Sequence, residues 1–284
     1  MICIGHSWLL DAPGVEVDRH PGINFSDLNI PKVMILNKEY TNLDEKLKYI
    51  RSNKINMVFT HHHMIKSYEE KTGVKFIFWP FAVDQKRFKD YGLKKEYDLT
   101  FVGILRNIKN PQTQTDVRLK TQKHLYYCIN DLRLFKKPKY NNLNIFWRGL
   151  PSTRVISIIS KILYGPTRYY FQDYYNLLNK TTICFNALAP LDLVSPRYYE
   201  SMASKCLVLC QQSDVYKGLF EDGKHCITFK NDLSNFDEKL FYYLNNNEER
   251  KKIIENAHHH VLNHHTWEKR ILQFTDELKN EHLI

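Results

Sequence analysis

The sequence predicts an α/β protein built from two parts, and three observations support this prediction. Short apolar runs typical of β-strands alternate with helical stretches along most of the chain. The alternation is interrupted between residues 80 and 97, where a charged segment shows little periodicity. With 284 residues, 43% of them hydrophobic and 25% charged, the chain is long enough for two domains of ordinary composition.

Each half contains an ordered series of expected elements. The expected strands are 2–5, 32–36, 56–60 and 75–79, followed by 98–102, 143–147, 182–186, 206–210 and 226–228. The expected helices lie near 43–52, 62–71, 114–134, 170–179, 196–204, 234–246 and 247–262. We therefore expect a first domain over residues 1–90, a second over 97–264, and a final helix within 266–284 that crosses back to the first domain.

Composition and charge narrow the class of protein. No apolar run approaches the roughly 20 residues that a membrane-spanning helix needs, and the first residues do not resemble a signal peptide. The six cysteines are scattered, which favours reduced thiols and a cytoplasmic location. The net charge of +10 suits nucleic acid, anionic lipid or a phosphorylated small molecule, but the basic residues form no single stripe.

The most informative segment follows the expected strand that ends at Asn186. Ser195 at the cap position and Pro196 after it predict a helix start at the carboxyl edge of a sheet. Free backbone N–H groups at such a helix start favour a phosphate, and Arg197 can hold diphosphate oxygens with its fork of donors. The carboxylate of Glu200 can accept hydrogen bonds from a ribose diol. The alternative interpretation is an ordinary helix N-terminus with a surface arginine.

Residues 192–209, with the sequence DLVSPRYYESMASKCLVL, resemble the donor-site segment of GT-B glycosyltransferases, most closely the CgeB-like and group 1 families. In group 1 enzymes two glutamates are separated by seven residues, and Asp192 and Glu200 keep that spacing with Asp in the first place. The resemblance implies that Ser195, Arg197, Tyr198 and Glu200 bind the donor, with Glu200 on the ribose. It also implies that Asp192 lies near the donor sugar or its phosphate.

Further segments resemble the same family in the same order. Residues 98–103 resemble the first strand and terminal glycine of the donor domain, and Arg106 and Lys109 follow at about the distance of the family's phosphate-binding cations. Gly103 is expected to allow close approach of the backbone to the donor, while the two cations neutralise a diphosphate leaving group. Residues 146–149, including Arg148 as a donor-site candidate, resemble the second strand of that domain.

The resemblance extends to both ends of the donor domain. Residues 83–88 resemble the segment that leaves the N-terminal domain, and residues 265–270 resemble the closing helix of CgeB-like proteins. The resemblance implies a GT-B fold, in which two Rossmann-like domains face one another across a cleft, here with a short N-terminal domain. It also implies that no metal binds at the donor phosphates, in agreement with the lack of an Asp-x-Asp motif.

An inverting enzyme of this fold uses a base on the N-terminal domain to remove the proton of the acceptor hydroxyl. The candidates after the first expected strand are His6, Asp11, Glu16, Asp18 and His20. Asp18 and His20 would combine a carboxylate with an imidazole. His61 directly follows an expected strand, at a position that contacts the donor sugar in some relatives. A retaining enzyme needs no such base, and a solvated loop side chain is the alternative interpretation for each residue.

The histidine runs at 61–63, 258–260 and 264–265 raise the question of a metal site. His260 and His264 would share one helix face, which is a spacing that metal ligands use. The sequence shows no third ligand close to them, so we predict no metal site.

The sequence therefore predicts a metal-independent glycosyltransferase that needs no cofactor beyond its donor substrate. The donor is a nucleoside diphosphate sugar, with uridine favoured, and the acceptor is a hydroxyl of a glycan or glycoconjugate. The basic, Tyr-rich surface suggests peripheral membrane association with such an acceptor, and no nucleic-acid partner is expected.

Two other functions stay open at this stage. Asp192 and the Ser204–Lys205 pair, where the family usually has glycine, are compatible with a degenerate GT-B protein that binds nucleotide without turnover. The net charge is compatible with a nucleic-acid-binding protein, although no nucleic-acid motif is present. The sugar, the acceptor, the stereochemical outcome and the oligomeric state are not determined by the sequence.

Overall fold

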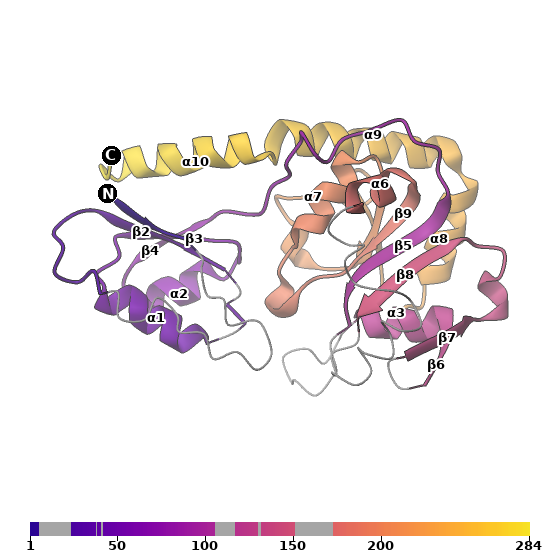
Figure 1. Cartoon of the computed structure of the whole chain (residues 1–284), viewed down its shortest axis with the longest axis horizontal. Helices are drawn as coiled ribbons and strands as arrows, with labels where there is room; N and C mark the ends of the chain where they lie inside the picture. Colours follow the sequence, from indigo (N-terminus) through magenta and orange to yellow (C-terminus); the bar gives the residue numbers. More distant parts are fainter. Residues whose placement is uncertain (6–23, 38, 41, 106–116, 130–131, 151–172) are drawn as a thin grey trace. The chain divides into compact units, whose positions relative to one another are not determined.

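The computed structural model describes residues 1–5, 24–37, 39–40, 42–105, 117–129, 132–150 and 173–284. The chain divides into two compact units, which are coloured along the sequence in Figure 1. The N-terminal unit comprises Met1–Phe81, Pro190–Leu193 and Glu268–Ile284. The C-terminal unit comprises Ala82–Ala189 and Val194–Trp267.

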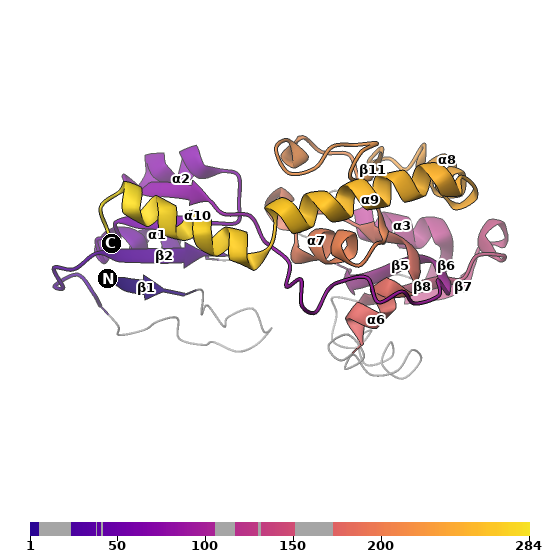
Figure 2. The same cartoon turned by 90° about the horizontal axis from the view of Figure 1, so that it is seen from above.

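The N-terminal unit is built on a four-stranded parallel sheet with the order β1-β2-β3-β4. Its strands are β1 (Ile2–Ile4), β2 (Lys32–Leu36), β3 (Met57–Thr60) and β4 (Lys75–Phe78). Helices α1 (Leu43–Ser52) and α2 (Ile65–Thr72) cover one face, where Leu47 and Tyr68 join the core beneath them. Helix α10 (Trp267–Asn280) covers the other face through Phe274 and Leu278 (Figures 1 and 2).

The C-terminal unit is built on a five-stranded parallel sheet with the order β11-β10-β9-β5-β8. The strands, in chain order, are β5 (Tyr97–Ile104), β8 (Ile145–Leu150), β9 (Thr181–Asn186), β10 (Leu207–Gln211) and β11 (Ile227–Phe229). The helices are α3 (Val117–Leu125), α6 (Tyr174–Asn179), α7 (Pro196–Ala203), α8 (Phe236–Asn245) and α9 (Asn247–His264). Short 3-10 turns lie at Pro138–Tyr140, Pro190–Asp192 and Asp214–Tyr216.

Each half has the alternating strands and helices that the sequence predicts, but the expected helix over 114–134 is wrong beyond Leu125. The chain there forms a separate two-stranded antiparallel hairpin of β6 (Tyr126–Ile129) and β7 (Leu132–Lys136). The run Tyr-Tyr-Cys-Ile is rich in residues that favour strands, and this local preference prevails over the helical pattern.

Residues 79–83 form hydrogen bonds with residues 265–270. In the C-terminal unit the backbone N–H of Val83 donates to the carbonyl of His265 at 2.9 Å. In the N-terminal unit the Nε of Arg270 donates to the carbonyl of Pro80 at 2.7 Å, and the Nε1 of Trp79 donates to the carbonyl of Arg270 at 3.0 Å. No helix in the described part of the chain is long and apolar enough to cross a membrane.

We predict that Gly149→Ala destabilises the C-terminal unit. An added Cβ would lie 2.6 Å from the Cδ1 of Leu105 and 2.7 Å from the Oε1 of Gln122. That oxygen also accepts the indole N–H of buried Trp147 at 3.0 Å, so it cannot move away freely. We expect a loss of about 1–3 kcal/mol in a urea titration followed by tryptophan fluorescence. Gly5→Ala, where nothing lies within 4 Å of the added Cβ, is the matched control. Equal stability of the two variants would contradict the prediction.

Candidate donor-binding site

Arg197 connects the first turn of α7 to the carboxyl end of β5. Its Nη1 donates to the backbone carbonyl of Val102, and its guanidinium carbon lies 5.9 Å from the centre of the Phe101 ring. A Cβ at position 103 would overlap this guanidinium, so the glycine gives Arg197 its space. The sequence argument gave Gly103 a different partner, the donor, and the structure shows that the close approach comes from Arg197.

Glu200 lies one turn further along α7 and is half-buried. Burial raises the pKa of its carboxyl group to about 7, and the positive charges of Arg197 and Arg87 oppose that shift. Arg87 belongs to the segment that connects the two units, and its guanidinium carbon lies 5.7 Å from the centre of the Tyr175 ring. A carboxylate flanked by two arginines is a charged acceptor held in a partly dry environment.

Ser195 caps α7 without using its side chain. It is 8% exposed, and its hydroxyl has no hydrogen-bond partner among the residues that the structure describes. An unpaired buried hydroxyl is unfavourable in the absence of a ligand or water. The N–H groups at the start of the eight-residue helix α7 lie beside it. Ser195 and this helix start are suited to the oxygens of an anion.

Tyr198 does not fit the binding role that the sequence argument gave it. Its side chain is fully buried, and its hydroxyl lies 2.8 Å from the hydroxyl of Tyr216. One residue along a helix is a turn of about 100°, so a residue next to Arg197 points in a different direction. Tyr174 is an aromatic residue on which the charges of both Glu200 and Arg197 act: burial raises the pKa of its hydroxyl, Glu200 raises it further and Arg197 lowers it.

Arg148 lies on β8, the strand that neighbours β5 at the edge of the sheet. It is paired in register with Val102, and the following pair is Gly103 with Gly149. Its guanidinium carbon lies 5.5 Å from the centre of the Phe146 ring. The structure therefore places Arg148 one strand from the backbone carbonyl that holds Arg197.

Four predicted site residues lie outside the described residues: Asp18, His20, Arg106 and Lys109. The other base candidates, His6, Asp11 and Glu16, lie outside them as well. Their predicted roles stay predictions.

His61 follows β3 at the carboxyl edge of the N-terminal sheet. Its Nδ1 lies 2.6 Å from the carbonyl of Trp79, and its ring stacks on that of Phe81 with centres 3.8 Å apart. A carbonyl can only accept, so Nδ1 must carry the proton. In the neutral ring Nε2 is then the nitrogen with a lone pair, which can accept a hydrogen bond from a hydroxyl.

Asp192 belongs to the N-terminal unit by its contacts, although it precedes α7 in the sequence. It is exposed, and both Asp192 and Leu191 have a left-handed backbone, with φ of 56° and 57°. This conformation is unfavourable by roughly 1–2 kcal/mol for each residue with a side chain. Strained backbone of this kind occurs preferentially at functional sites.

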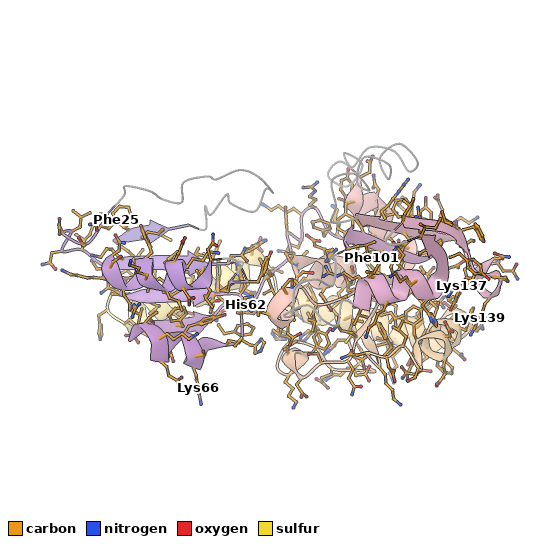
Figure 3. All side chains as sticks on the ribbon, turned by 90° about the horizontal axis from the view of Figure 1, so that it is seen from below. Phe25, His62, Lys66, Phe101, Lys137 and Lys139 are labelled. Atoms are coloured by element: carbon orange, nitrogen blue, oxygen red, sulfur yellow. The ribbon has the colours of Figure 1, made fainter. Side chains whose placement is uncertain are left out.

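A buried polar cluster behind His61 was missed by the sequence argument. Glu39, 1% exposed, accepts a hydrogen bond from the hydroxyl of Thr60, and its other oxygen lies 3.5 Å from the Nε2 of His62. Figure 3 labels His62 on the turn after β3. Burial raises the pKa of Glu39, and burial together with the neighbouring histidines lowers the pKa of His62 to about 4. Glu39 lies in no recognisable motif, so no pattern in the sequence predicts its role.

The later histidine run forms a cluster in the C-terminal unit. His260 stacks on His225 with ring centres 4.1 Å apart, and its Nε2 lies 2.7 Å from the carbonyl of Leu219 and 3.2 Å from the Nε2 of His265. The contact with the carbonyl requires a proton on the Nε2 of His260, which leaves that nitrogen no lone pair for a metal. No group of three or more metal-ligating side chains is present in the part of the chain that the structure describes.

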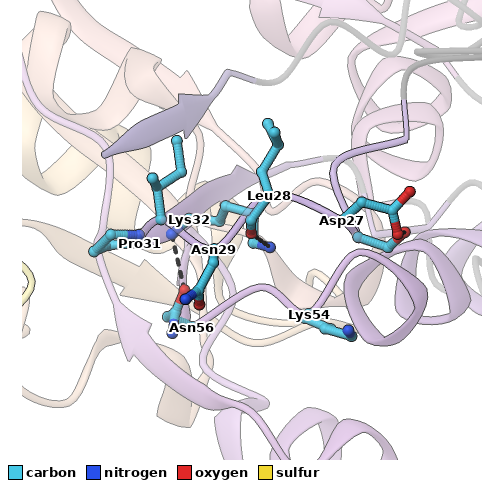
Figure 4. Close-up of a pocket in the computed structure, with 9 residues that line it drawn as sticks. Asp27, Leu28, Asn29, Pro31, Lys32, Lys54 and Asn56 are labelled. Atoms are coloured by element: carbon cyan, nitrogen blue, oxygen red, sulfur yellow. Dashed lines mark hydrogen bonds between the residues drawn. The ribbon is translucent and has the colours of Figure 1, made fainter.

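Each unit has a pocket that is lined by described residues. One of about 490 Å³ lies at the amino end of β2 and is lined by residues that include Asp27, Lys32 and Asn56 (Figure 4). The ammonium group of Lys32 there donates to two backbone carbonyls, so two of its three donors are already used. The second, of about 720 Å³, follows β10 and is lined by residues that include Ser213 and Lys217. Only the second lies at the carboxyl edge of its sheet, where ligands of α/β proteins bind.

The family described as glycosyl transferase-like matches residues 146–276. The structure of HepE from Anabaena, in complex with UDP and glucose, aligns with a TM-score of 0.58 at 11% identity, over 88% of this chain and 72% of HepE. The chain has the GT-B glycosyltransferase fold. The predicted resemblance and the predicted fold class are thereby confirmed.

Other GT-B structures agree with this assignment. A TarM variant from S. aureus, in complex with Fondaparinux, alpha-GlcNAc-glycerol and UDP, has a TM-score of 0.60 at 13% identity, over 87% of this chain. A glycosyltransferase from Rickettsia africae has a TM-score of 0.56 at 14% identity, over 88% of this chain and 70% of that one. The chain spans 50% of the length of TarM. A search of curated proteins finds no sequence match.

We predict that Glu200→Gln stabilises the unliganded protein at pH 8. The folded-state pKa of about 7 lies above the ordinary value of 4.5, so the stability that Glu200 contributes at low pH is lost as the pH rises through 7. Glutamine does not ionise, and the variant should exceed the wild type by about 1–2 kcal/mol at pH 8 and by much less at pH 5. Urea titrations at the two pH values measure this difference. Glu248→Gln, an exposed carboxylate on α9, should change stability little at either pH. A lower stability of Glu200→Gln at pH 8 would overturn the account.

Proposed function

We propose that this protein transfers a sugar from a nucleoside diphosphate sugar, with UDP as the favoured carrier, to a hydroxyl of a glycan or glycoconjugate. The observation that carries the proposal is the placement of Arg197 and Glu200 in the first turns of α7 in a GT-B fold, where the charge of Arg197 acts on the carboxyl group of Glu200. HepE and TarM, which share this fold, were each crystallised with UDP. These complexes support UDP as the carrier for this chain.

In this proposal α7 binds the diphosphate and the ribose. The N–H groups of its first turn and the hydroxyl of Ser195 would donate to phosphate oxygens, and Arg197 would add a charged donor. Glu200 would accept hydrogen bonds from the ribose diol, and Arg87 would help to hold that carboxylate ionised. Arg106, Lys109 and Arg148 are proposed as further positive charges for the leaving diphosphate. No metal is required for this arrangement, because cationic side chains and the helix N-terminus supply the positive potential.

The N-terminal unit would supply the groups that act on the sugar and the acceptor. His61, with its proton fixed on Nδ1, is proposed to accept a hydrogen bond from a sugar hydroxyl through Nε2. Asp192, on its strained loop, is proposed to lie near the donor sugar or its phosphate. Asp18 and His20 are proposed as the base if the enzyme inverts the anomeric configuration.

A catalytically degenerate nucleotide-binding protein is the second candidate function. The observation that favours it is Asp192 in place of the family's first glutamate. Release of sugar from a UDP-sugar in the absence of acceptor separates the two candidates, because a degenerate protein would bind nucleotide and release none.

The proposal predicts that one nucleoside diphosphate, UDP, selectively raises the melting temperature. A ligand that binds only the folded state stabilises it by about 2.7 kcal/mol at one hundred times its dissociation constant. We would test UDP, GDP, ADP, CMP and UDP-sugars at millimolar concentration by thermal shift. Arg197→Ala should remove the UDP shift, because it removes the charged donor at the diphosphate.

Lys251→Ala is the matched control, because Lys251 is an exposed cation on α9 that forms an ion pair with nearby Glu248. This variant should keep the full UDP shift. No shift with any nucleotide, or an equal shift in Arg197→Ala, would contradict the proposal. Salt-sensitive binding of an oligonucleotide under the same conditions would favour the nucleic-acid alternative instead.

A further inference from the structure

The β6–β7 hairpin exposes large apolar side chains to solvent. Tyr127, Ile129, Leu134 and Phe135 are 45%, 61%, 43% and 64% exposed. The rings of Tyr127 and Phe135 contact each other with centres 5.1 Å apart. The hairpin is separate from both main sheets and packs beside α3 at the periphery of the C-terminal unit (Figure 1).

The register of the β6–β7 hairpin is irregular. Tyr126 pairs with Lys136 and Cys128 pairs with Arg133, so two steps on β6 correspond to three on β7. The extra residue is a β-bulge, and the adjacent residues Leu134 and Phe135 of β7 are both exposed. The opposite side of the hairpin is the attached one, where Tyr126 is buried in the core.

The segment that contains the hairpin is strongly basic. Residues 117–140 contain seven lysines and arginines and one acidic residue, Asp131. Lys136 donates to the carbonyl of Leu143 at 2.7 Å and Lys139 to Asp237 at 2.8 Å, so these two cations have internal partners. The ammonium of Lys137, labelled in Figure 3, lies 5.9 Å from the centre of the Tyr127 ring, directly beside the apolar residues.

We propose that the β6–β7 hairpin docks on an anionic lipid bilayer, with Tyr127, Ile129, Leu134 and Phe135 inserted at the interface and the flanking cations on the headgroups. Aromatic and aliphatic side chains with lysines whose stems run along them suit the boundary between headgroups and hydrocarbon. Stable protein interfaces bury about 800 Å² on each partner, drawn from roughly 20–30 residues. A hairpin of four and five residues per strand is small for that purpose, which favours the bilayer over a second copy of the chain.

Co-sedimentation with large unilamellar vesicles tests this proposal. We expect the full chain to bind vesicles of 70% phosphatidylcholine and 30% phosphatidylserine, and to bind pure phosphatidylcholine at least tenfold more weakly. Ile129→Ser combined with Phe135→Ser should weaken binding to the anionic vesicles at least tenfold, because both side chains would return to water. Lys137→Glu should weaken it about fivefold or more, because each cation near an anionic surface contributes about that factor.

The matched control is Ile271→Ser combined with Leu272→Ser, two side chains of α10 that are 60% and 57% exposed. This control should bind as the wild type does. A wild type that ignores anionic vesicles, or a hairpin double variant that binds them unchanged, would overturn the proposal. A lipid-free wild type that sediments as a dimer and becomes monomeric in the hairpin variant would instead assign the surface to self-association. The UDP shift of the hairpin variants should be unchanged, so the outcome is independent of the proposed transferase function.

Discussion

The hydrogen bond from the Arg197 guanidinium to the carbonyl of Val102 joins the start of α7 to the end of β5, and the candidate site depends on it. A hydrogen bond from a charged group contributes about 1.5–3 kcal/mol, enough to fix the orientation of a helix end. It requires glycine at position 103, because any side chain there would occupy the space of the guanidinium. With Arg197 so placed, the carboxyl group of Glu200 lies within the field of two arginines, and the unpaired hydroxyl of Ser195 lies at the same helix end.

The features that suit this site to a ligand lower the stability of the unliganded protein. A carboxylate whose pKa is raised to about 7 is partly protonated near neutral pH, and its ionised form is unfavourable until a ligand donates to it. The buried hydroxyl of Ser195 and the left-handed backbone of Leu191 and Asp192 add further unfavourable terms. Proteins retain such features where they serve a ligand, and sequences that fold consistently elsewhere break local rules at such positions.

Much of the fold could be predicted because its signals are local. The strands of both sheets follow apolar runs, and Ser195-Pro196 marks the start of α7 within one residue. The helical period of about 3.6 residues places the side chain of Tyr198 on a different face of α7 from Arg197 and Glu200. The burial of Tyr198 could therefore have been predicted from the sequence of this helix. The hairpin after Leu125 was missed because aromatic and β-branched residues occur there without a turn signal strong enough to end a helix.

The missed parts of the site come from contacts between distant residues. The charge of Arg87 acts on Glu200 from a segment more than a hundred residues earlier, and no pattern in either segment predicts this interaction. Gly103 was recognised as a position of close approach, but only the structure identifies Arg197 as the group that approaches. Glu39 and His62 lie close together because the parallel strands β2 and β3 end at the same edge of the sheet. The order of strands predicts that residues after them are neighbours, but it does not predict which polar side chains interact.

The central claim is that Glu200 holds the ribose of the donor nucleotide, and calorimetry at pH 8 tests it most directly. UDP and its 2′,3′-dideoxy analogue would be titrated into the wild type and into Glu200→Ala. We predict that the wild type binds UDP at least tenfold more tightly than the analogue, because only UDP offers the diol, and that the variant binds both equally. A wild type that does not distinguish the two ligands, or a variant that keeps the full preference, would contradict the assignment of Glu200.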